Sequence, residues 1–238
     1  MAVLKTENLT RHFGGLVALN RVNMEFREDE ILGIIGPNGA GKTTFINVIA
    51  GIYLPTEGKI FFEDQEISDL PAHKRCRLGI ARTFQLVRPL QGLSLLENVM
   101  VGALFGNGLR QGEARRKAEE WCEFLGLSDI TRDITRMTAL EVKKMEIAHA
   151  LAAQPKLLFL DEVMAGLNSD ETKEMIDVVR RIHSRGIVIG IVEHVMRVIR
   201  ELTDRVVVLD WGEIIAQGPY EEVSNDPRVI TAYLGEEA

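Results

Sequence analysis

Short apolar runs alternate with longer amphipathic segments along much of this chain. In its C-terminal third, each apolar run has the length of a buried strand and each amphipathic segment the length of a helix. Strands are expected at residues 157–160, 187–192 and 206–209, and helices near 171–185 and 195–202. This alternation predicts an α/β fold with a mostly parallel sheet covered on both faces, and a ligand at the carboxyl ends of its strands.

The N-terminal part combines strand patterns with a glycine-rich turn. Residues 22–26 alternate apolar and polar side chains, which predicts a half-buried strand, and residues 31–35 and 59–62 are further apolar runs of strand length. A helix-compatible segment, 44–50, follows the turn, and residues 219–234 predict one or two short helices.

The middle of the chain has a different pattern, with helical segments between glycine-containing loops. Helices are expected at residues 93–101, 113–125 and 140–153. We therefore expect one domain in which residues of about 1–85 and 155–238 form a core and residues of about 86–154 a helical insertion. The basic cluster Arg110, Arg115, Arg116 and Lys117, close to Glu119 and Glu120, predicts a solvated helix face.

The glycine-rich turn matches the P-loop pattern G-x-x-x-x-G-K-[ST]. It contains Gly36, Pro37, Asn38, Gly39, Ala40, Gly41, Lys42, Thr43 and Thr44. A buried strand precedes it and a helix follows, so backbone N–H groups and a helix N-terminus can surround phosphate oxygens. Lys42 is expected to reach the β- and γ-phosphates, and the Thr43 hydroxyl to bind Mg²⁺. ATP and Mg²⁺ are the expected ligands.

Two adjacent carboxylates follow the apolar run 157–160. Downstream of a P-loop, acids at a strand end are expected beside the metal and the attacking water. We expect Asp161 to orient the hydration shell of the metal and Glu162 to act as general base toward water.

Composition narrows the class of protein further. The net charge of −7 argues against nucleic acid as the main partner. Cys76 and Cys122 lie far apart without metal-site spacing, which indicates a reducing compartment and neither a disulfide framework nor a zinc site. The N-terminus shows no signal-peptide pattern, and the longest apolar runs are too short to span a bilayer. If the protein works at a membrane, another chain must supply the spanning helices.

From about Leu4 to Leu234 the chain resembles the ATP-binding subunits of ABC transporters, most closely the ATPases of branched-chain amino-acid importers. The closer match lies in residues 79–85, 95–99, 165–167, 192–194 and 232–237; the lipopolysaccharide-export ATPases share several of these. The resemblance implies a P-loop core of the RecA type, an antiparallel β subdomain and a helical signalling subdomain. It also implies a second ATPase subunit, membrane permease subunits, and a cytoplasmic location at the inner face of the membrane.

The resemblance assigns further roles by position. Gln85 matches the Q-loop glutamine, which contacts Mg²⁺ and the attacking water and links the core to the helical subdomain. His194 matches the switch histidine, which contacts the γ-phosphate. Phe13 matches the aromatic residue that stacks on adenine, with Phe in place of the commoner Tyr.

Three motifs depart from the family pattern. The signature Leu-Ser-Gly-Gly-Gln, which contacts the γ-phosphate on the opposite subunit, is here Met137, Thr138, Ala139, Leu140 and Glu141. The Leu140 side chain is expected to obstruct the approaching anion and Glu141 to repel it. The proline after Asp-Glu is Val163, and the D-loop aspartate is Asn168. A homodimer would carry the altered signature in both sites and should hydrolyse ATP slowly, whereas a partner with an intact signature would leave one site sound.

Three functions are compatible with these motifs. The first is an ATPase that energises a membrane importer, with a surface near residues 85–101 that receives a cytoplasmic helix of the permease. The second is an ATP-binding clamp with weak turnover, which the altered signature favours. The third is a small-molecule kinase, against which the set of Gln85, Glu162 and His194 argues. The transported solute cannot be identified from this chain, because the membrane and solute-binding subunits select it.

Overall fold

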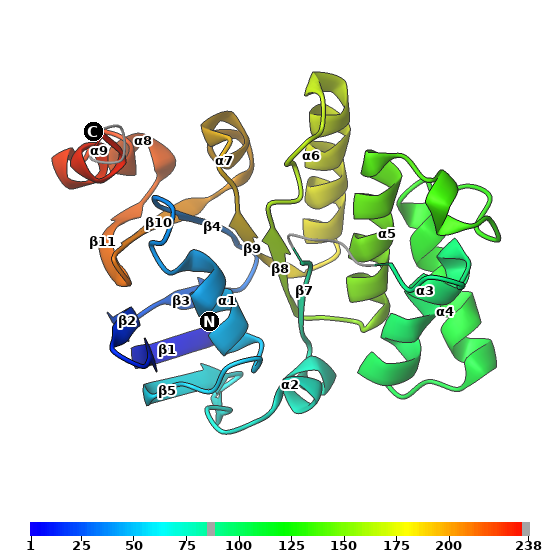
Figure 1. Cartoon of the computed structure of the whole chain (residues 1–238), viewed down its shortest axis with the longest axis horizontal. Coiled ribbons are helices and arrows are strands. Elements are labelled where there is room, and N and C mark those ends of the chain that lie inside the picture. The colour runs from blue at the N-terminus through cyan, green and yellow to red at the C-terminus, as the bar shows by residue number, and fades with distance from the viewer. Residues whose placement is uncertain (85–88, 235–238) are drawn as a thin grey trace.

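The computed structural model describes residues 1–84 and 89–234, and two β-sheets organise them (Figure 1). The larger sheet has six strands in the order β11-β10-β4-β9-β8-β7. Their bounds are β4 Ile31–Ile35, β7 Ile80–Arg82, β8 Leu157–Asp161, β9 Val188–Val192, β10 Arg205–Asp210 and β11 Glu213–Gly218. Every pairing is parallel except that of β10 with β11, which confirms the expected mostly parallel sheet.

The smaller sheet is antiparallel and packs beside the first. It contains β1 Ala2–Phe13, β2 Leu16–Val22, β5 Glu57–Phe62 and β6 Gln65–Glu66, with β3 Glu25–Arg27 paired to β1. The expected single strand at 22–26 is wrong, because β2 ends at Val22. The Asn23 side chain accepts a hydrogen bond from the Asn8 N–H at 2.9 Å, so the ladder along β1 is interrupted between β2 and β3. The expected alternation holds, since Val22, Met24 and Phe26 are all buried.

The helices fall into two groups. Along the two sheets lie α1 Lys42–Ile49, α2 Ala72–Leu78, α6 Ser169–His183, α7 Met196–Leu202, α8 Tyr220–Val223 and α9 Pro227–Leu234. At one end of the molecule α3 Leu95–Val101, the π-helical turn η1 Gly102–Gly106, α4 Gln111–Phe124, the 3₁₀ turn η2 Ile134–Arg136 and α5 Ala139–Ala152 pack on one another (Figure 1).

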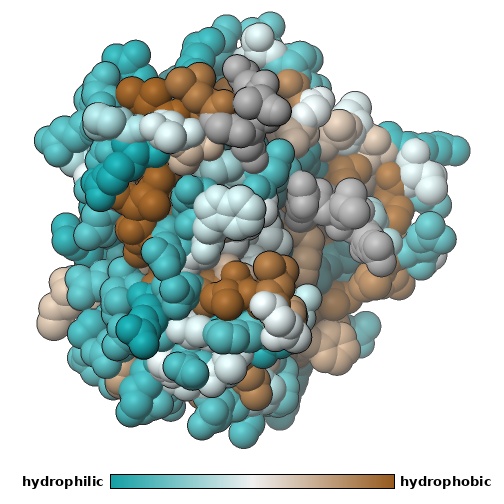
Figure 2. All heavy atoms as spheres, turned by 60° about the vertical axis from the view of Figure 1, so that its left-hand side comes forward, coloured by the Kyte–Doolittle hydropathy of each residue, from teal (hydrophilic) through white to brown (hydrophobic). Residues whose placement is uncertain are grey.

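The hydrophobic core has two parts. One fills the space between the two sheets and α1, where the rings of Phe26 and Phe159 meet edge to face at 5.3 Å. The other runs from the α6 side of the larger sheet into the helical group. The face shown in Figure 2 is mostly hydrophilic, and its hydrophobic groups form separate patches.

The predicted solvated face of α4 is confirmed. Arg115 pairs with Glu119 at 2.9 Å and Lys117 with Glu120 at 2.8 Å, all at the surface. Of residues 1–84 and 89–234, none belongs to a helix long and apolar enough to cross a membrane.

Candidate nucleotide site

The P-loop joins the end of β4 to the start of α1. Close backbone packing requires glycine at two of its positions. Gly36 has φ 145°, and a Cβ there would lie 2.0 Å from the Leu209 carbonyl oxygen; Gly41 has φ 103°, and a Cβ there would lie 2.6 Å from the Ala18 carbonyl oxygen. The loop is therefore held tightly between β10 and β2, with the N-terminus of α1 facing the cavity beside it.

Lys42 is buried, and its ammonium closes the loop on itself. Its Nζ donates hydrogen bonds to the carbonyl oxygens of Gly36 at 2.7 Å and Pro37 at 2.8 Å. A phosphate bound beside the loop would offer this ammonium negatively charged acceptors, which are stronger than neutral carbonyls. The position of Lys42 thus agrees with a β/γ-phosphate contact.

A cavity of about 430 Å³ opens beside the loop. It is lined by Phe13, Leu16, Val17, Ala18, Asn38, Gly39, Ala40, Gly41, Lys42, Thr43, Thr44, Glu162, His194 and Trp211. Residues of the first β-hairpin, the P-loop and the ends of β8 and β9 therefore meet around one space. Phe13 is 37% exposed, and its ring contacts Tyr53 edge to face and lies 4.5 Å from the Arg11 guanidinium carbon.

Asp161 ends β8 and is almost fully buried. Its backbone N–H donates to the Thr83 hydroxyl at 3.0 Å, and its Oδ2 accepts from Arg82 Nη2 at 3.0 Å. Its other oxygen, Oδ1, is buried and has no hydrogen-bond partner. Burial raises the pKa of Asp161, and the charges of Arg82 and Lys42 oppose this rise. A buried carboxylate oxygen without a partner beside a phosphate site fits a cation-binding role.

Glu162 and His194 are in contact at the wall of the cavity. Glu162 Oε1 lies 2.9 Å from His194 Nε2, and because a carboxylate only accepts, the imidazole donates. Glu162 has φ 52°, and its N–H donates to the Val192 carbonyl of β9 at 2.9 Å. From α5, Lys143 Nζ donates to the Glu162 carbonyl at 3.2 Å. The two predicted catalytic side chains are therefore brought together.

Behind this pair lies a buried carboxyl group that the sequence analysis missed. Glu193 is 2% exposed and accepts the Met164 N–H at 2.8 Å, so it joins the end of β9 to the segment that follows β8. Burial raises the pKa of Glu193 to about 7.

The signature residues form the N-terminus of α5. Thr138 caps the helix: its hydroxyl accepts the Glu141 N–H at 3.3 Å, and the Glu141 carboxylate accepts the Thr138 N–H at 2.8 Å. Glu141 also pairs with Arg132 at 2.6 Å, and this pairing with the Thr138 contact lowers its pKa. Leu140 is 9% exposed and packs in the helical core. The expected obstruction by its side chain is therefore wrong, because the side chain points inward, and the Glu141 charge is partly balanced.

The D-loop positions also have structural roles. The Asn168 side chain caps α6 by accepting the N–H groups of Asp170 at 2.9 Å and Glu171 at 3.0 Å. Val163 is buried, as is Met164. The side-chain oxygen of Asn168 thus serves as the helix cap.

Not every predicted residue can be placed, and several residues around the cavity were missed. Gln85 lies outside the described residues. Arg82 and Lys143 were given no role in the sequence analysis, and Trp211 and the 16–18 segment were not expected at the cavity. A charged residue inside a short buried strand, as Arg82 is in β7, is the signal that could have revealed the first of these.

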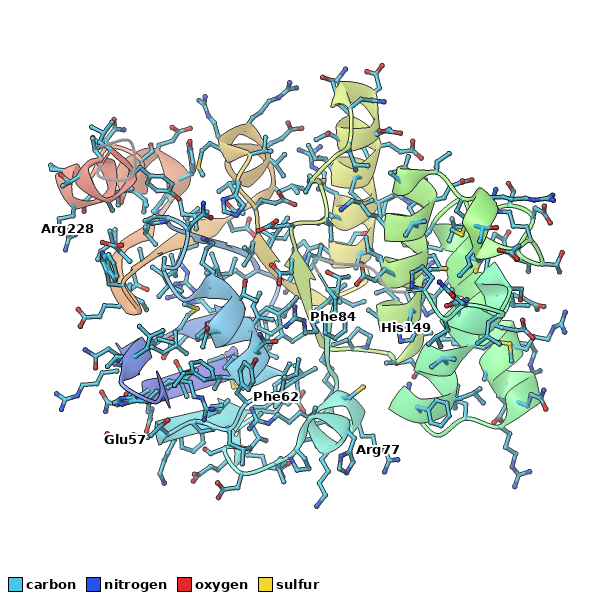
Figure 3. All side chains as sticks on the ribbon, in the orientation of Figure 1. Glu57, Phe62, Arg77, Phe84, His149 and Arg228 are labelled. Carbon is cyan, nitrogen blue, oxygen red and sulfur yellow. The ribbon has the colours of Figure 1, made fainter. Side chains whose placement is uncertain are left out.

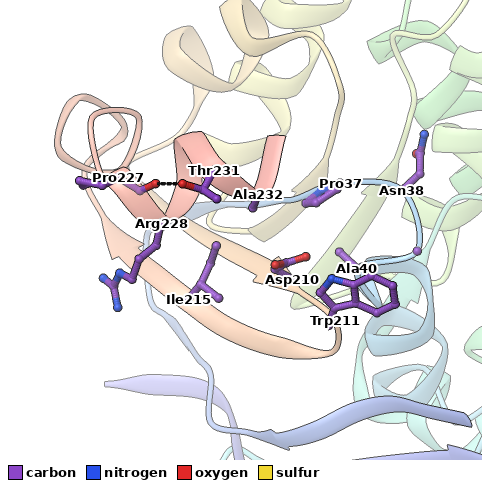
Figure 4. A pocket seen from close by; sticks show the side chains of 11 residues that line it. Pro37, Asn38, Ala40, Asp210, Trp211, Ile215, Pro227, Arg228, Thr231 and Ala232 are labelled. Carbon is purple, nitrogen blue, oxygen red and sulfur yellow. Dashed lines mark hydrogen bonds between the residues drawn. The ribbon is translucent and has the colours of Figure 1, made fainter. Parts of the chain in front are cut away.

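A second hollow of about 730 Å³ lies on the outer side of the P-loop (Figure 4). It separates the loop and the β10–β11 turn from α9, whose residues Arg228, Thr231 and Ala232 form its far wall. Asn38, Gly39, Ala40 and Trp211 line both spaces, so the two adjoin.

Comparison with known proteins identifies the family of this chain. The ABC transporter family model matches residues 19–165, and a branched-chain amino acid ATP-binding cassette transporter model matches residues 213–238. The chain is 38% identical over 250 residues to the high-affinity branched-chain amino acid transport ATP-binding protein LivG of Escherichia coli (strain K12), with 98% of each chain covered.

Solved structures show the same fold. A nucleotide-free ATP-binding cassette from an ABC transporter superposes with a TM-score of 0.90 at 31% identity, covering 98% of this chain and 99% of that one. A dimeric cassette in a post-hydrolysis state, bound to ADP and phosphate, gives a TM-score of 0.81 at 25% identity, covering 91% and 98%. The chain therefore belongs to the ABC transporter family, as an ATP-binding ATPase subunit.

Proposed function

We propose that this protein hydrolyses ATP to energise a membrane importer of branched-chain or related amino acids. The observation that carries the proposal is the convergence of Lys42, Glu162 and His194 on one cavity at the carboxyl edge of the sheet. The amino-acid class rests on the likeness to LivG and on the match at residues 213–238.

Mg²⁺ is the proposed metal, and the residues present fit it. Asp161 Oδ1 is a buried oxygen with no partner, and Thr43 lies in the cavity wall at the start of α1. Hydroxyl and carboxylate oxygens are ligands that Mg²⁺ prefers. Thr43, Asp161 and Gln85 are the proposed metal residues; the bound ion would neutralise charge on the β- and γ-phosphates.

The protein side chains supply positioning and proton transfer. Lys42 and the backbone N–H groups of residues 38–44 hold the phosphates, and the Phe13 ring offers a face to adenine. Glu162 takes a proton from the attacking water, and the His194 imidazole holds the carboxylate in place. When that hydrogen bond is released, the same N–H would donate to the γ-phosphate. Gln85 completes the proposed catalytic set.

We propose that two such subunits close around ATP, each covering the nucleotide of the other with its signature. Residues 137–141 lie at the N-terminus of α5, where backbone N–H groups can meet a phosphate of the opposite subunit. Residues of about 86–154 would form the helical signalling subdomain, and the remainder the catalytic core. The partner subunit is either a second copy of this chain or a different ATPase.

The permease would dock near residues 85–101. Phe84 adjoins this segment and is 52% exposed, Leu90 lies within it and is 46% exposed, and Phe105 of η1 is 72% exposed. Exposed aromatic and aliphatic side chains of this kind are typical of an interface. Docking there would hold the protein at the inner, cytoplasmic face of the membrane. Nucleic acid is not a proposed partner.

The Lys42→Ala variant tests the nucleotide site. Removing the ammonium that faces the phosphates should weaken ATP binding by about 100-fold or more, because a buried phosphate would be left without its charge-assisted hydrogen bonds. Binding is measured by calorimetric titration with ATP, and Lys173→Ala, an exposed lysine of α6, is the matched control. Unchanged ATP affinity in Lys42→Ala would remove the basis of the proposed site.

A clamp with weak turnover is the second candidate function. The observation that favours it is the carboxylate of Glu141 at the N-terminus of α5, where a phosphate is expected. Phosphate release at saturating Mg-ATP, with and without a reconstituted permease, separates the two. A rate that stays near zero in both preparations supports the clamp.

A further inference from the structure

We propose that Arg82 is a positioning residue that fixes the orientation of Asp161, and that the exposed ring of Phe84 supports Arg82 from the surface. The proposal rests on the proposed function, because Asp161 is taken as a metal ligand. It links the exposed surface at Phe84 to Asp161, the carboxylate proposed to bind the metal.

The strand pairing brings Arg82 to Asp161. Arg82 ends β7, which pairs in parallel with β8, and β8 ends at Asp161. Arg82 Nη2 contacts Asp161 Oδ2 at 3.0 Å, Nη1 donates to Asn47 Oδ1 of α1, and Nε donates to the Thr83 carbonyl at 2.9 Å. All three guanidinium nitrogens are engaged, so the plane of the group is fixed relative to both the strand and the P-loop helix.

This arrangement determines which carboxylate oxygen of Asp161 is left without a hydrogen-bond partner. The side chains of Arg82 and Asp161 are 7% and 1% exposed, so water does not compete for the pair. Arg82 occupies Oδ2 and leaves Oδ1 as the buried oxygen without a partner. Without Arg82 the carboxylate of Asp161 could rotate, and neither oxygen would be held in place as a preorganised ligand for the cation.

Phe84 joins this pair to the surface. Its ring lies 4.5 Å from the guanidinium carbon of Arg82, within the range of a cation–π contact, while 52% of the residue is exposed. Its backbone N–H donates to the Glu146 carboxylate of α5, so the main chain that carries the ring is anchored to the helical group. Figure 3 places Phe84 at the end of β7, between the sheet and α5. A partner that contacts the Phe84 ring would therefore act directly on the cation–π contact with Arg82.

Magnesium titrations of nucleotide binding test the proposal. The affinity of the full-length protein for the fluorescent analogue mant-ATP is measured first in EDTA and then against increasing Mg²⁺. In Arg82→Met the affinity in EDTA should stay within about twofold of wild type, because the phosphate contacts are intact. The Mg²⁺ concentration for half-maximal effect should rise about tenfold, as expected when one charge-assisted hydrogen bond is removed.

Arg82→Lys distinguishes positioning from simple charge balance. Lysine keeps the positive charge but cannot reach Asp161, Asn47 and the Thr83 carbonyl together. Positioning predicts a rise of about threefold or more in the Mg²⁺ requirement, whereas charge balance predicts wild-type behaviour. An unchanged or lower Mg²⁺ requirement in both Arg82 variants would overturn the proposal. Arg82→Lys and Phe84→Leu carry the test if Arg82→Met does not fold.

Phe84→Leu tests the surface link. It removes the cation–π contact, keeps an apolar side chain, and should raise the Mg²⁺ requirement about threefold. In the double variant with Arg82→Met the effect should equal that of Arg82→Met alone, because both changes act through one contact. Fully additive effects would contradict the link.

A matched pair elsewhere serves as control. The Arg181 guanidinium carbon lies 4.4 Å from the ring centre of Phe124, far along the chain from the P-loop, so Arg181→Met and Phe124→Leu should leave the titration unchanged. The titration of the wild-type protein distinguishes a failure of the proposed function from a failure of the role of Arg82. No Mg²⁺-dependent binding in wild type would contradict the proposed function itself. Normal binding in wild type with no change in the Arg82 variants would contradict only the role of Arg82.

Discussion

Some titratable side chains near the cavity are buried where water does not reach them. Glu193 illustrates the consequence for stability, since burial raises its pKa to about 7 from a usual value of 4.5. Below about pH 4.5 the folded and unfolded chains both keep this proton. Between pH 4.5 and 7 the unfolded chain releases it first, so the raised pKa increasingly favours unfolding as the pH rises.

Replacing Glu193 with Gln should remove this pH-dependent loss of folding stability. The amide keeps an acceptor for the Met164 N–H. Relative to wild type, Glu193→Gln should gain about 2–3 kcal/mol in free energy of unfolding between about pH 4.5 and pH 8, following the size of the shift. Urea unfolding across this pH range measures the difference, with Glu123→Gln on the exposed face of α4 as control. A constant difference between Glu193→Gln and wild type would show that Glu193 does not titrate in this range.

At the scale of secondary structure elements, buried polar contacts hold the P-loop helix in place. Arg75 of α2 is fully buried, and burial lowers its pKa to about 10. Its guanidinium donates to the carbonyl oxygens of Val48 at 2.7 Å and Ile49 at 2.9 Å, at the C-terminal end of α1. It donates further to the carbonyls of Leu70 and Ser68, both at 2.7 Å.

Arg75→Met should destabilise the protein by about 3–5 kcal/mol, because the backbone carbonyls that it bonds would be left without their donor. The exposed Arg77 of the same helix provides the control, and Arg77→Met should stay within about 0.5 kcal/mol of wild type. The midpoint and slope of urea unfolding give both values. A loss below about 1 kcal/mol for Arg75→Met would mean that other groups or water satisfy these carbonyls.

A second prediction at this scale concerns α5, whose N-terminus holds the signature residues 137–141. Glycine at position 140 would remove a buried side chain, so Leu140→Gly should cost about 2–5 kcal/mol of stability. The full family pattern, Thr138→Ser, Ala139→Gly, Leu140→Gly and Glu141→Gln, should nevertheless tighten ATP-dependent dimerisation and raise hydrolysis, because it removes a charge beside the phosphate. Analytical ultracentrifugation with ATP and phosphate release measure the two effects.

One further variant makes that experiment decisive. Thr138→Ser with Glu141→Gln keeps Leu140 and should change stability little, so it separates the effect of charge from the effect of packing. If neither set of changes alters dimerisation or turnover, Leu140 and Glu141 are tolerated, and the interpretation of residues 137–141 as a degenerate signature is wrong.

Elements with strong periodicity could be predicted from the sequence, whereas those formed by tertiary contacts could not. The buried strand β4 and the P-loop were expected because an apolar run and a glycine pattern are local features. The polar helix α2 and the short strand β7 have no such local pattern, and they depend on Arg75 and on pairing with β8. For the same reason the sequence placed Glu162 and His194 at a site but did not reveal Arg82 or Glu193, whose importance comes from burial.

At the scale of the whole molecule, the two sheets and the helical group bring distant segments to one edge of the larger sheet. The P-loop follows β4, the carboxylates follow β8, and His194 follows β9, so the site exists only in the folded chain. In the proposed dimer the signature serves the nucleotide of the second subunit. In that arrangement, substitutions at the signature would alter hydrolysis at the partner's site, whereas Lys42→Ala would alter binding at this chain's own site.

The central claim is that Glu162 activates water against ATP held by the P-loop. Phosphate release from saturating Mg-ATP by wild type and Glu162→Gln tests it most directly, with ATP affinity measured in parallel. We predict that Glu162→Gln binds ATP as wild type does and releases phosphate more slowly by about 100-fold or more, the scale of general-base catalysis. A wild-type rate in Glu162→Gln would contradict the account, because another group would then activate the water.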